Sequence, residues 1–200
     1  GKYINYLLPG IIVQTTLFGA LNTGIGLAED MGKGIIDRFR SLPMSRISVM
    51  AGRTFSDMIR NLVVMLIMIS AGYVYGFRFQ NGFIPAISMI GLILFFTFSF
   101  SWIAAFIGMT VKDAETAQLA SFVIIFPLTF ASAAFVPINS MVSWLQVFAR
   151  NQPITFAVDA ARQLALGLPS TGAVWKLLLW TLGILIVFIP LSIQRYKARV

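Results

Sequence analysis

Charged side chains that could do chemistry are few in this sequence, and some of them recur at helical spacing. Arg53, Asp57 and Arg60 stand at positions i, i+4 and i+7. This spacing predicts an ion pair between Arg53 and Asp57 along one helix face, while the long side chain of Arg60 reaches toward polar surroundings. The pattern favours anchoring at a boundary between water and an apolar phase over a substrate site.

Catalytic and metal-binding chemistry finds little support in the residue types present. The sequence has no His and no Cys, so a serine nucleophile would lack its usual imidazole base and thiol chemistry is excluded. No acidic pair has metal-ligand spacing, and the sequence contains neither a GxxxxGK[ST] phosphate loop nor a dinucleotide fingerprint. We therefore expect no enzyme activity in the chain itself, and no metal or cofactor bound by it.

A second charged cluster, GIIDRFRSLPMSR at residues 34–46, has the pattern of a short amphipathic helix. Gly34 starts this helix and Pro43 stops it. Asp37 and Phe39 add mixed charge and a protruding aromatic ring, which suit a docking surface, whereas a plain amphipathic connector would need only basic residues. Docking element and connector both remain open from these residues alone.

The elements that position these residues follow from the hydropathy of the chain. Hydrophobic residues make up 58% of the sequence and charged residues 11%, which is typical of a membrane protein. Because about 20 residues of helix cross the hydrocarbon core, the uncharged stretches predict an all-α polytopic membrane protein with one transmembrane domain over residues 1–200. Pro127 is expected to kink the fourth span at its middle. Five spans are expected, at about residues 3–27, 48–77, 84–109, 116–135 and 174–193.

Basic residues are unevenly divided between the two ends of these predicted spans. If the helices alternate in direction, ten of the 15 Lys and Arg residues lie on one side, which includes residues 34–46 and the carboxyl-terminal tail. The positive-inside rule makes that side cytoplasmic in the plasma (inner) membrane, with the carboxyl terminus inside. This placement favours a role in topology for the net charge of +8 over nucleic-acid binding.

Five spans also put the amino end of the sequence outside. No initiator Met and no cleavable signal peptide explain how an outside amino end was delivered. We therefore expect a truncated chain whose parent protein has six spans, the first of which precedes Gly1.

Residues 135–172 interrupt the pattern of spans. They are too polar and too rich in proline to cross a membrane, yet they keep apolar residues at helical spacing. We expect two short re-entrant helices, at about residues 141–149 and 154–166, which dip into the outer leaflet and close the pathway from outside. Pro137, Trp144 and Pro153 are the expected gate residues, and an ordinary surface loop is the alternative.

Acidic and basic residues are absent from the middle of every predicted span. Ion-coupled carriers and voltage sensors keep ionisable groups there, because those groups carry the mechanism. If this protein is a pump, its energy therefore comes from elsewhere.

Two stretches resemble a known family. Residues 26–61, GLAEDMGKGIIDRFRSLPMSRISVMAGRTFSDMIRN, are similar to the coupling-helix region of type 2 ABC exporter permeases, especially the daunorubicin-resistance-like drug efflux branch. Residues 126–167, FPLTFASAAFVPINSMVSWLQVFARNQPITFAVDAARQLALG, resemble the fifth span and outer re-entrant helices of the same family. The resemblance runs through the chain in order and lacks only the first span of the family.

The resemblance implies a permease homodimer, made of two copies of one chain. Its cytosolic coupling helices would rest on separate ATPase subunits that bind ATP and Mg²⁺. It implies export of lipophilic drugs or related compounds, while export of polysaccharide or lipid-linked glycan and a non-transporting membrane scaffold are the alternatives. The residues expected to contact the ATPase are Gly34, Asp37, Arg38, Phe39, Arg40, Ser41, Leu42 and Pro43.

Overall fold

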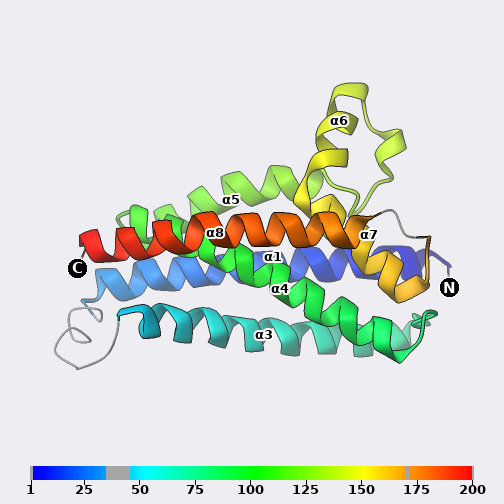
Figure 1. The fold of residues 1–200 in the computed structure, drawn as a ribbon, viewed down its shortest axis with the longest axis horizontal. Helices are drawn as coiled ribbons and strands as arrows, with labels where there is room; N and C mark the ends of the chain where they lie inside the picture. Colours follow the sequence, from blue (N-terminus) through cyan, green and yellow to red (C-terminus); the bar gives the residue numbers. More distant parts are fainter. Residues whose placement is uncertain (1, 35–45, 170–171, 200) are drawn as a thin grey trace.

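The computed structural model describes residues 2–34, 46–169 and 172–199, and within them the chain is helical and contains no strand. This confirms the all-α prediction. The helices appear in Figure 1, and their order is α1 (Lys2–Gly32), α3 (Arg46–Val74), α4 (Phe83–Thr110), α5 (Ala114–Phe130), the short 3-10 helix η1 (Ile138–Ser140), α6 (Ser143–Asn151), α7 (Pro153–Leu166) and α8 (Ala173–Arg199).

Four helices of the described chain, α1, α3, α4 and α8, are long and apolar enough to cross a membrane. They confirm a polytopic membrane protein. The remaining predicted span, the fourth, corresponds to α5, an apolar helix of only 17 residues. At about 1.5 Å per residue it is about 25 Å long, which is shorter than the hydrocarbon core of about 30 Å.

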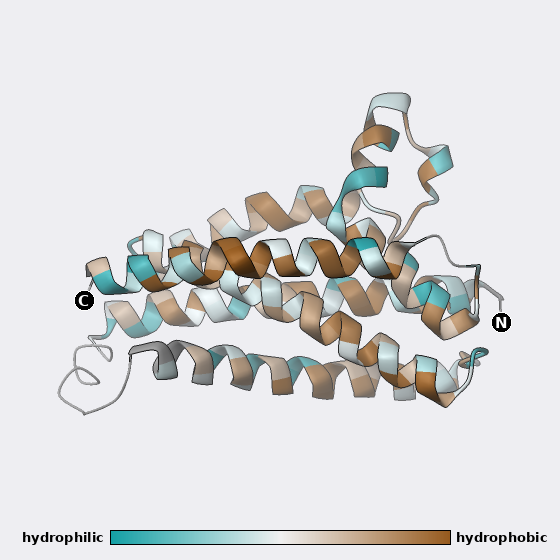
Figure 2. Ribbon diagram, viewed as in Figure 1, coloured by the Kyte–Doolittle hydropathy of each residue, from teal (hydrophilic) through white to brown (hydrophobic). Residues whose placement is uncertain are grey.

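The long helices and α5 run side by side along the long axis of the molecule, and in the order α1, α3, α4, α5 and α8 they alternate in direction (Figure 1). One end of the molecule, which we call the basic end, contains the end of α1, the start of α3, the α4–α5 connection and the carboxyl end of α8 (Figure 1). The start of α1, the α3–α4 connection, α6 and α7 lie at the opposite end, which we call the hairpin end. Brown apolar residues dominate the lengths of the helices between these ends (Figure 2).

Helices α1 and α4 cross closely toward the basic end of the bundle, where glycines let the two backbones meet. A Cβ atom added to Gly24 would lie 2.1 Å from the carbonyl oxygen of Ala104, and one added to Gly108 would lie 2.1 Å from that of Gly24. Close approach at small residues is how apolar helices pack in a membrane. Buried side chains such as Leu17 and Phe96 fill the core beside this crossing.

Two helix ends differ from their predicted positions. Helix α1 continues to Gly32 instead of ending near residue 27, because Asp30 pairs with Arg53 of α3 and Glu29 pairs with Lys33 along the helix. Helix α5 ends at Phe130 instead of residue 135. The predicted kink at the middle of this span was therefore wrong, since Pro127 lies in the last turn of α5.

Asp113 fixes the start of α5. Its side chain accepts a hydrogen bond from the backbone N–H of Thr116 at 2.7 Å, as an N-cap residue does. This backbone hydrogen bond holds the pKa of the Asp113 carboxyl below its ordinary value. The cap is therefore at full strength at neutral pH and weakens as the pH falls through that lowered pKa.

Candidate functional site

Polar side chains join α1 to α3 at the basic end. Arg53 of α3 forms an ion pair with Asp30 of α1. Asp57, which is only 6% exposed, accepts a hydrogen bond from the hydroxyl of Thr23 and pairs with Arg60 at 2.8 Å. We call these five residues the α1–α3 clasp. The predicted pair between Arg53 and Asp57 was wrong. Arg53 pairs with an acidic residue of α1, whereas Asp57 binds Thr23 of α1 and Arg60, one turn further along α3.

Two glycines of α1 make room for the clasp. A Cβ atom on Gly26 would overlap the guanidinium of Arg53, with only 1.6 Å to its nearest nitrogen, and one on Gly19 would lie 2.1 Å from the side-chain oxygen of Asn61. The carbonyl of Gly19 also accepts a hydrogen bond from Arg60 at 3.2 Å. The helices therefore approach closely enough for short polar contacts inside an apolar bundle.

The clasp joins the two helices between which the predicted coupling segment lies in the sequence. Gly34 follows the end of α1 with a positive φ of 66°, and its N–H donates to the carbonyl of Met31 at 3.2 Å. The other predicted contact residues lie outside the described part of the chain: Asp37, Arg38, Phe39, Arg40, Ser41, Leu42 and Pro43. The helices that precede and follow this segment in the sequence, α1 and α3, are thus tied to one another by the clasp.

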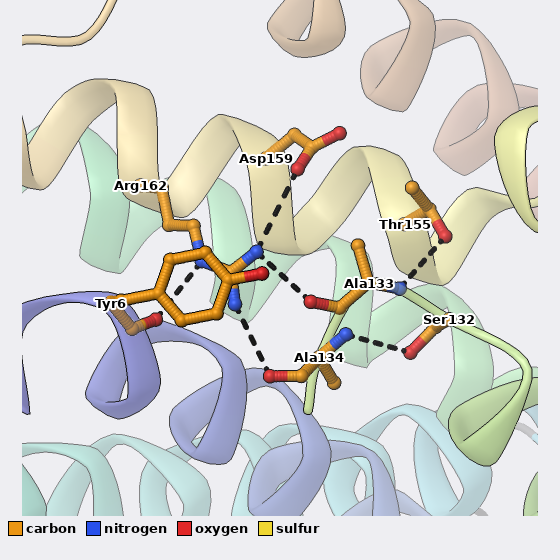
Figure 3. A network of polar contacts seen from close by, with 7 residues as sticks. All are labelled: Tyr6, Ser132, Ala133, Ala134, Thr155, Asp159 and Arg162. Atoms are coloured by element: carbon orange, nitrogen blue, oxygen red, sulfur yellow. Dashed lines mark hydrogen bonds and ion pairs between the residues drawn. The ribbon is translucent and has the colours of Figure 1, made fainter. Parts of the chain in front are cut away.

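A second polar network lies at the hairpin end and is centred on Arg162 of α7 (Figure 3). The buried guanidinium donates to the carbonyls of Tyr6, Ala133 and Ala134 at 3.0, 2.9 and 3.2 Å. It also stacks on the ring of Tyr6, 3.6 Å from the centroid. Asp159 is 3.9 Å away and supplies the opposite charge. Arg162 therefore joins α7 to α1 and to the chain that follows α5.

Backbone N–H and carbonyl groups just beyond the end of α5 lack helical hydrogen bonds. Side chains of α7, and of Gln152 directly before α7, supply hydrogen bonds to several of them. Gln152 donates to the carbonyl of Ala131 at 2.6 Å. Thr155 accepts from the N–H of Ala133 at 3.3 Å, as Figure 3 shows. Irregular backbone at membrane depth is tolerated where protein groups replace the missing helical bonds. Together with Arg162, these residues hold the chain from Ala131 to Ala134 in place.

Comparison with known proteins decides the family. The family model described as ABC-2 type transporter matches residues 1–166. The chain belongs to the ABC-2 type transporter family. The resemblance noted for residues 26–61 and 126–167 is thereby confirmed. No solved structure matches this ABC-2 chain significantly.

Several similar curated proteins are permeases named for drug resistance. The ABC-2 chain is 32% identical over 196 residues to the daunorubicin resistance ABC transporter permease protein DrrB1 of Streptomyces coeruleorubidus. The matched region covers 98% of this chain and 69% of that protein. The ABC-2 chain is also 29% identical to the doxorubicin resistance ABC transporter permease protein DrrB of Mycobacterium tuberculosis, over 80% of this chain and 55% of that protein.

The predicted gate residues of the ABC-2 chain are not gathered into one site. Pro137 lines a cavity of about 360 Å³ beside Arg162 and Asp159. Trp144 of α6 is 74% exposed, and Pro153 is buried as the first residue of α7. Helix α6 stands away from the bundle, while α7 packs against α1, α4 and α8 (Figure 1). Both short helices are present, but they have different surroundings.

The sequence analysis did not identify Arg162 or Thr23 as site residues. A signal for Arg162 is nevertheless present, because it is a lone Arg in the alanine-rich stretch AVDAARQLAL. A charged residue within an apolar helix needs partners, and these are the carbonyls beyond α5. Thr23 gave no such signal, because threonine is common in apolar helices.

Proposed function

We propose that this chain is the membrane-spanning permease subunit of an ATP-driven exporter that moves lipophilic drugs or related hydrophobic compounds out of the cell. The observation that carries the proposal is the similarity to a daunorubicin resistance permease along 98% of the chain. The apolar helices and the scarcity of charge in the spans support it, because such a bundle needs an external source of energy.

The proposed source of energy is a separate cytosolic ATPase subunit that binds ATP and Mg²⁺. The helix expected at residues 34–43 docks on it, and two permease copies assemble as a homodimer in the plasma membrane with the basic end in the cytoplasm. The α1–α3 clasp supports this role, because a push on the segment between two tied helices displaces both of them together. Closure of two ATPases would then rock the spans between inward and outward access.

The test removes the docking contacts and leaves the bundle intact. We expect Arg38→Glu and Phe39→Ala each to abolish ATP-dependent doxorubicin efflux from cells that express both subunits, while membrane insertion is unchanged. Matched controls are Arg195→Glu, which makes the same charge change at the same end, and Phe55→Ala, which removes an exposed ring from α3. Copurification with the ATPase should fall in the two docking variants only. Wild-type efflux in both docking variants would contradict the docking role.

A further inference from the structure

An apolar cavity of about 360 Å³ lies between α5 and α8. Helix α5 packs chiefly against α1, whereas α8 packs chiefly against α4, so the space between α5 and α8 is left for other occupants. Side chains of α4, α5 and α8 line it, among them Phe100, Leu128, Trp180 and Ile184, and residues 148–153 close it toward the hairpin end.

The cavity has the form of a small-molecule site that opens toward lipid. Its volume falls within the range of about 300–1,000 Å³ that is usual for ligand pockets. Ile124 and Trp180, which line it, are each partly exposed on the outer surface of the helical bundle. A compound dissolved in the bilayer could therefore enter sideways without crossing a polar barrier.

One polar residue of the cavity wall has an unused hydrogen-bonding atom. Gln152 is only 4% exposed, and its side-chain nitrogen donates to the carbonyl of Ala131. Its side-chain oxygen is buried and has no hydrogen-bond partner among the described residues. An acceptor in apolar surroundings is costly to leave unpaired, so a ligand that donates a hydrogen bond there gains both the bond and the relief of that cost.

We propose that this cavity binds the transported compound, a lipophilic molecule with an aromatic part that lies among Phe100, Trp180 and Ile184 and a hydroxyl or amine that donates to Gln152. The inference rests on the proposed export function and names its substrate site. Gln152 also holds the carbonyl of Ala131 just beyond α5. Ligand binding therefore touches the same residue that holds the irregular chain in place, which links occupancy of the cavity to the position of the hairpin end.

The first test fills the cavity. Ile184→Trp adds a large side chain to its wall, and Ile186→Trp makes the same change at a neighbouring position that is 72% exposed and does not line the cavity. In the complete transporter with its ATPase subunit, reconstituted in lipid nanodiscs, we expect Ile184→Trp to weaken doxorubicin binding by about tenfold or more and the control to stay within about twofold. Efflux should fall in the same order.

The second test addresses the hydrogen bond with two probes that differ in one donor, 1-pyrenemethanol and 1-methylpyrene. Gln152→Met removes the acceptor and keeps the length of the side chain. We expect it to weaken binding of 1-pyrenemethanol by about tenfold, and to leave binding of 1-methylpyrene unchanged. The melting temperature of the variant, measured without probe, shows whether the variant is folded. A folded variant should still bind 1-methylpyrene, so loss of both probes would indicate a damaged cavity.

Several results would overturn the inference. Wild-type binding and efflux in Ile184→Trp would do so, as would an equal loss of both pyrene probes in Gln152→Met. Loss of the ATPase subunit or of the second permease copy from Ile184→Trp would instead make this face a subunit interface. A phospholipid that copurifies in the cavity and is not displaced by 1-pyrenemethanol would assign it to lipid. If the wild type binds 1-pyrenemethanol through Gln152 but exports no doxorubicin, the proposed function fails and the site remains.

Discussion

Arg162 carries a buried positive charge on α7, and its surroundings explain how an apolar bundle accommodates it. Three carbonyl oxygens and the ring of Tyr6 surround the guanidinium, and Asp159 lies at the edge of the network. The planar fork of an arginine can serve several acceptors at once, which a lysine ammonium cannot do with the same geometry. Arg162 therefore acts as a positioning residue for the chain beyond α5.

The first prediction at this scale is that Arg162→Met destabilises the hairpin end. Removal of the guanidinium leaves the carbonyls of Ala133 and Ala134 without these partners, at a cost of about 1–3 kcal/mol for each buried group. Thermal unfolding in detergent should show a clear fall in melting temperature. Arg150→Met is the matched control, because Arg150 is exposed and its hydrogen bonds within the described residues go to the side chains of Asn139 and Gln146. A melting temperature equal to that of the control would contradict this role.

At the scale of the helices, the crossing of α1 and α4 depends on the absence of a side chain at Gly24. We predict that Gly24→Ala destabilises the bundle by about 1–3 kcal/mol, as overpacking of a close contact does, because its Cβ would meet the Ala104 carbonyl. Gly91→Ala on α4 meets no atom within 4 Å and should be neutral or slightly stabilising. Unfolding by denaturant measures both. Equal stability of the two variants would contradict a close contact between the backbones of α1 and α4 at Gly24.

The helices could largely be predicted from the sequence, whereas their polar contacts could not. Uncharged stretches revealed α1, α3, α4 and α8, because the length of a span is dictated by the bilayer. The end of α5 was missed, since it depends on Gln152, Thr155 and Arg162, which reach it only after the chain has folded. The partner of Arg53 was missed for the same reason: spacing along one helix favoured Asp57, but Asp30 of another helix is nearer in space.

At the scale of the whole molecule, the alternation of helices separates two ends that should face different compartments. The chain has no native Cys, so single cysteines report on sidedness without further changes. We predict that a membrane-impermeant thiol reagent labels Ser143→Cys, at the hairpin end, in intact cells. Glu115→Cys, at the start of α5, should be labelled only after the membrane is permeabilised. The reverse pattern would place the predicted docking segment on the side that lacks ATP.

The irregular chain from Ala131 to Ala134 also has a consequence for biogenesis. Its hydrogen-bonding partners Gln152, Thr155 and Arg162 are all encoded later in the sequence, so the ribosome finishes α5 before it makes the residues that complete its end. Until α7 has emerged and docked, those peptide groups must keep water or the translocation channel as their neighbours. We therefore expect the release of α5 into lipid to wait for synthesis of the segment some twenty to thirty residues downstream.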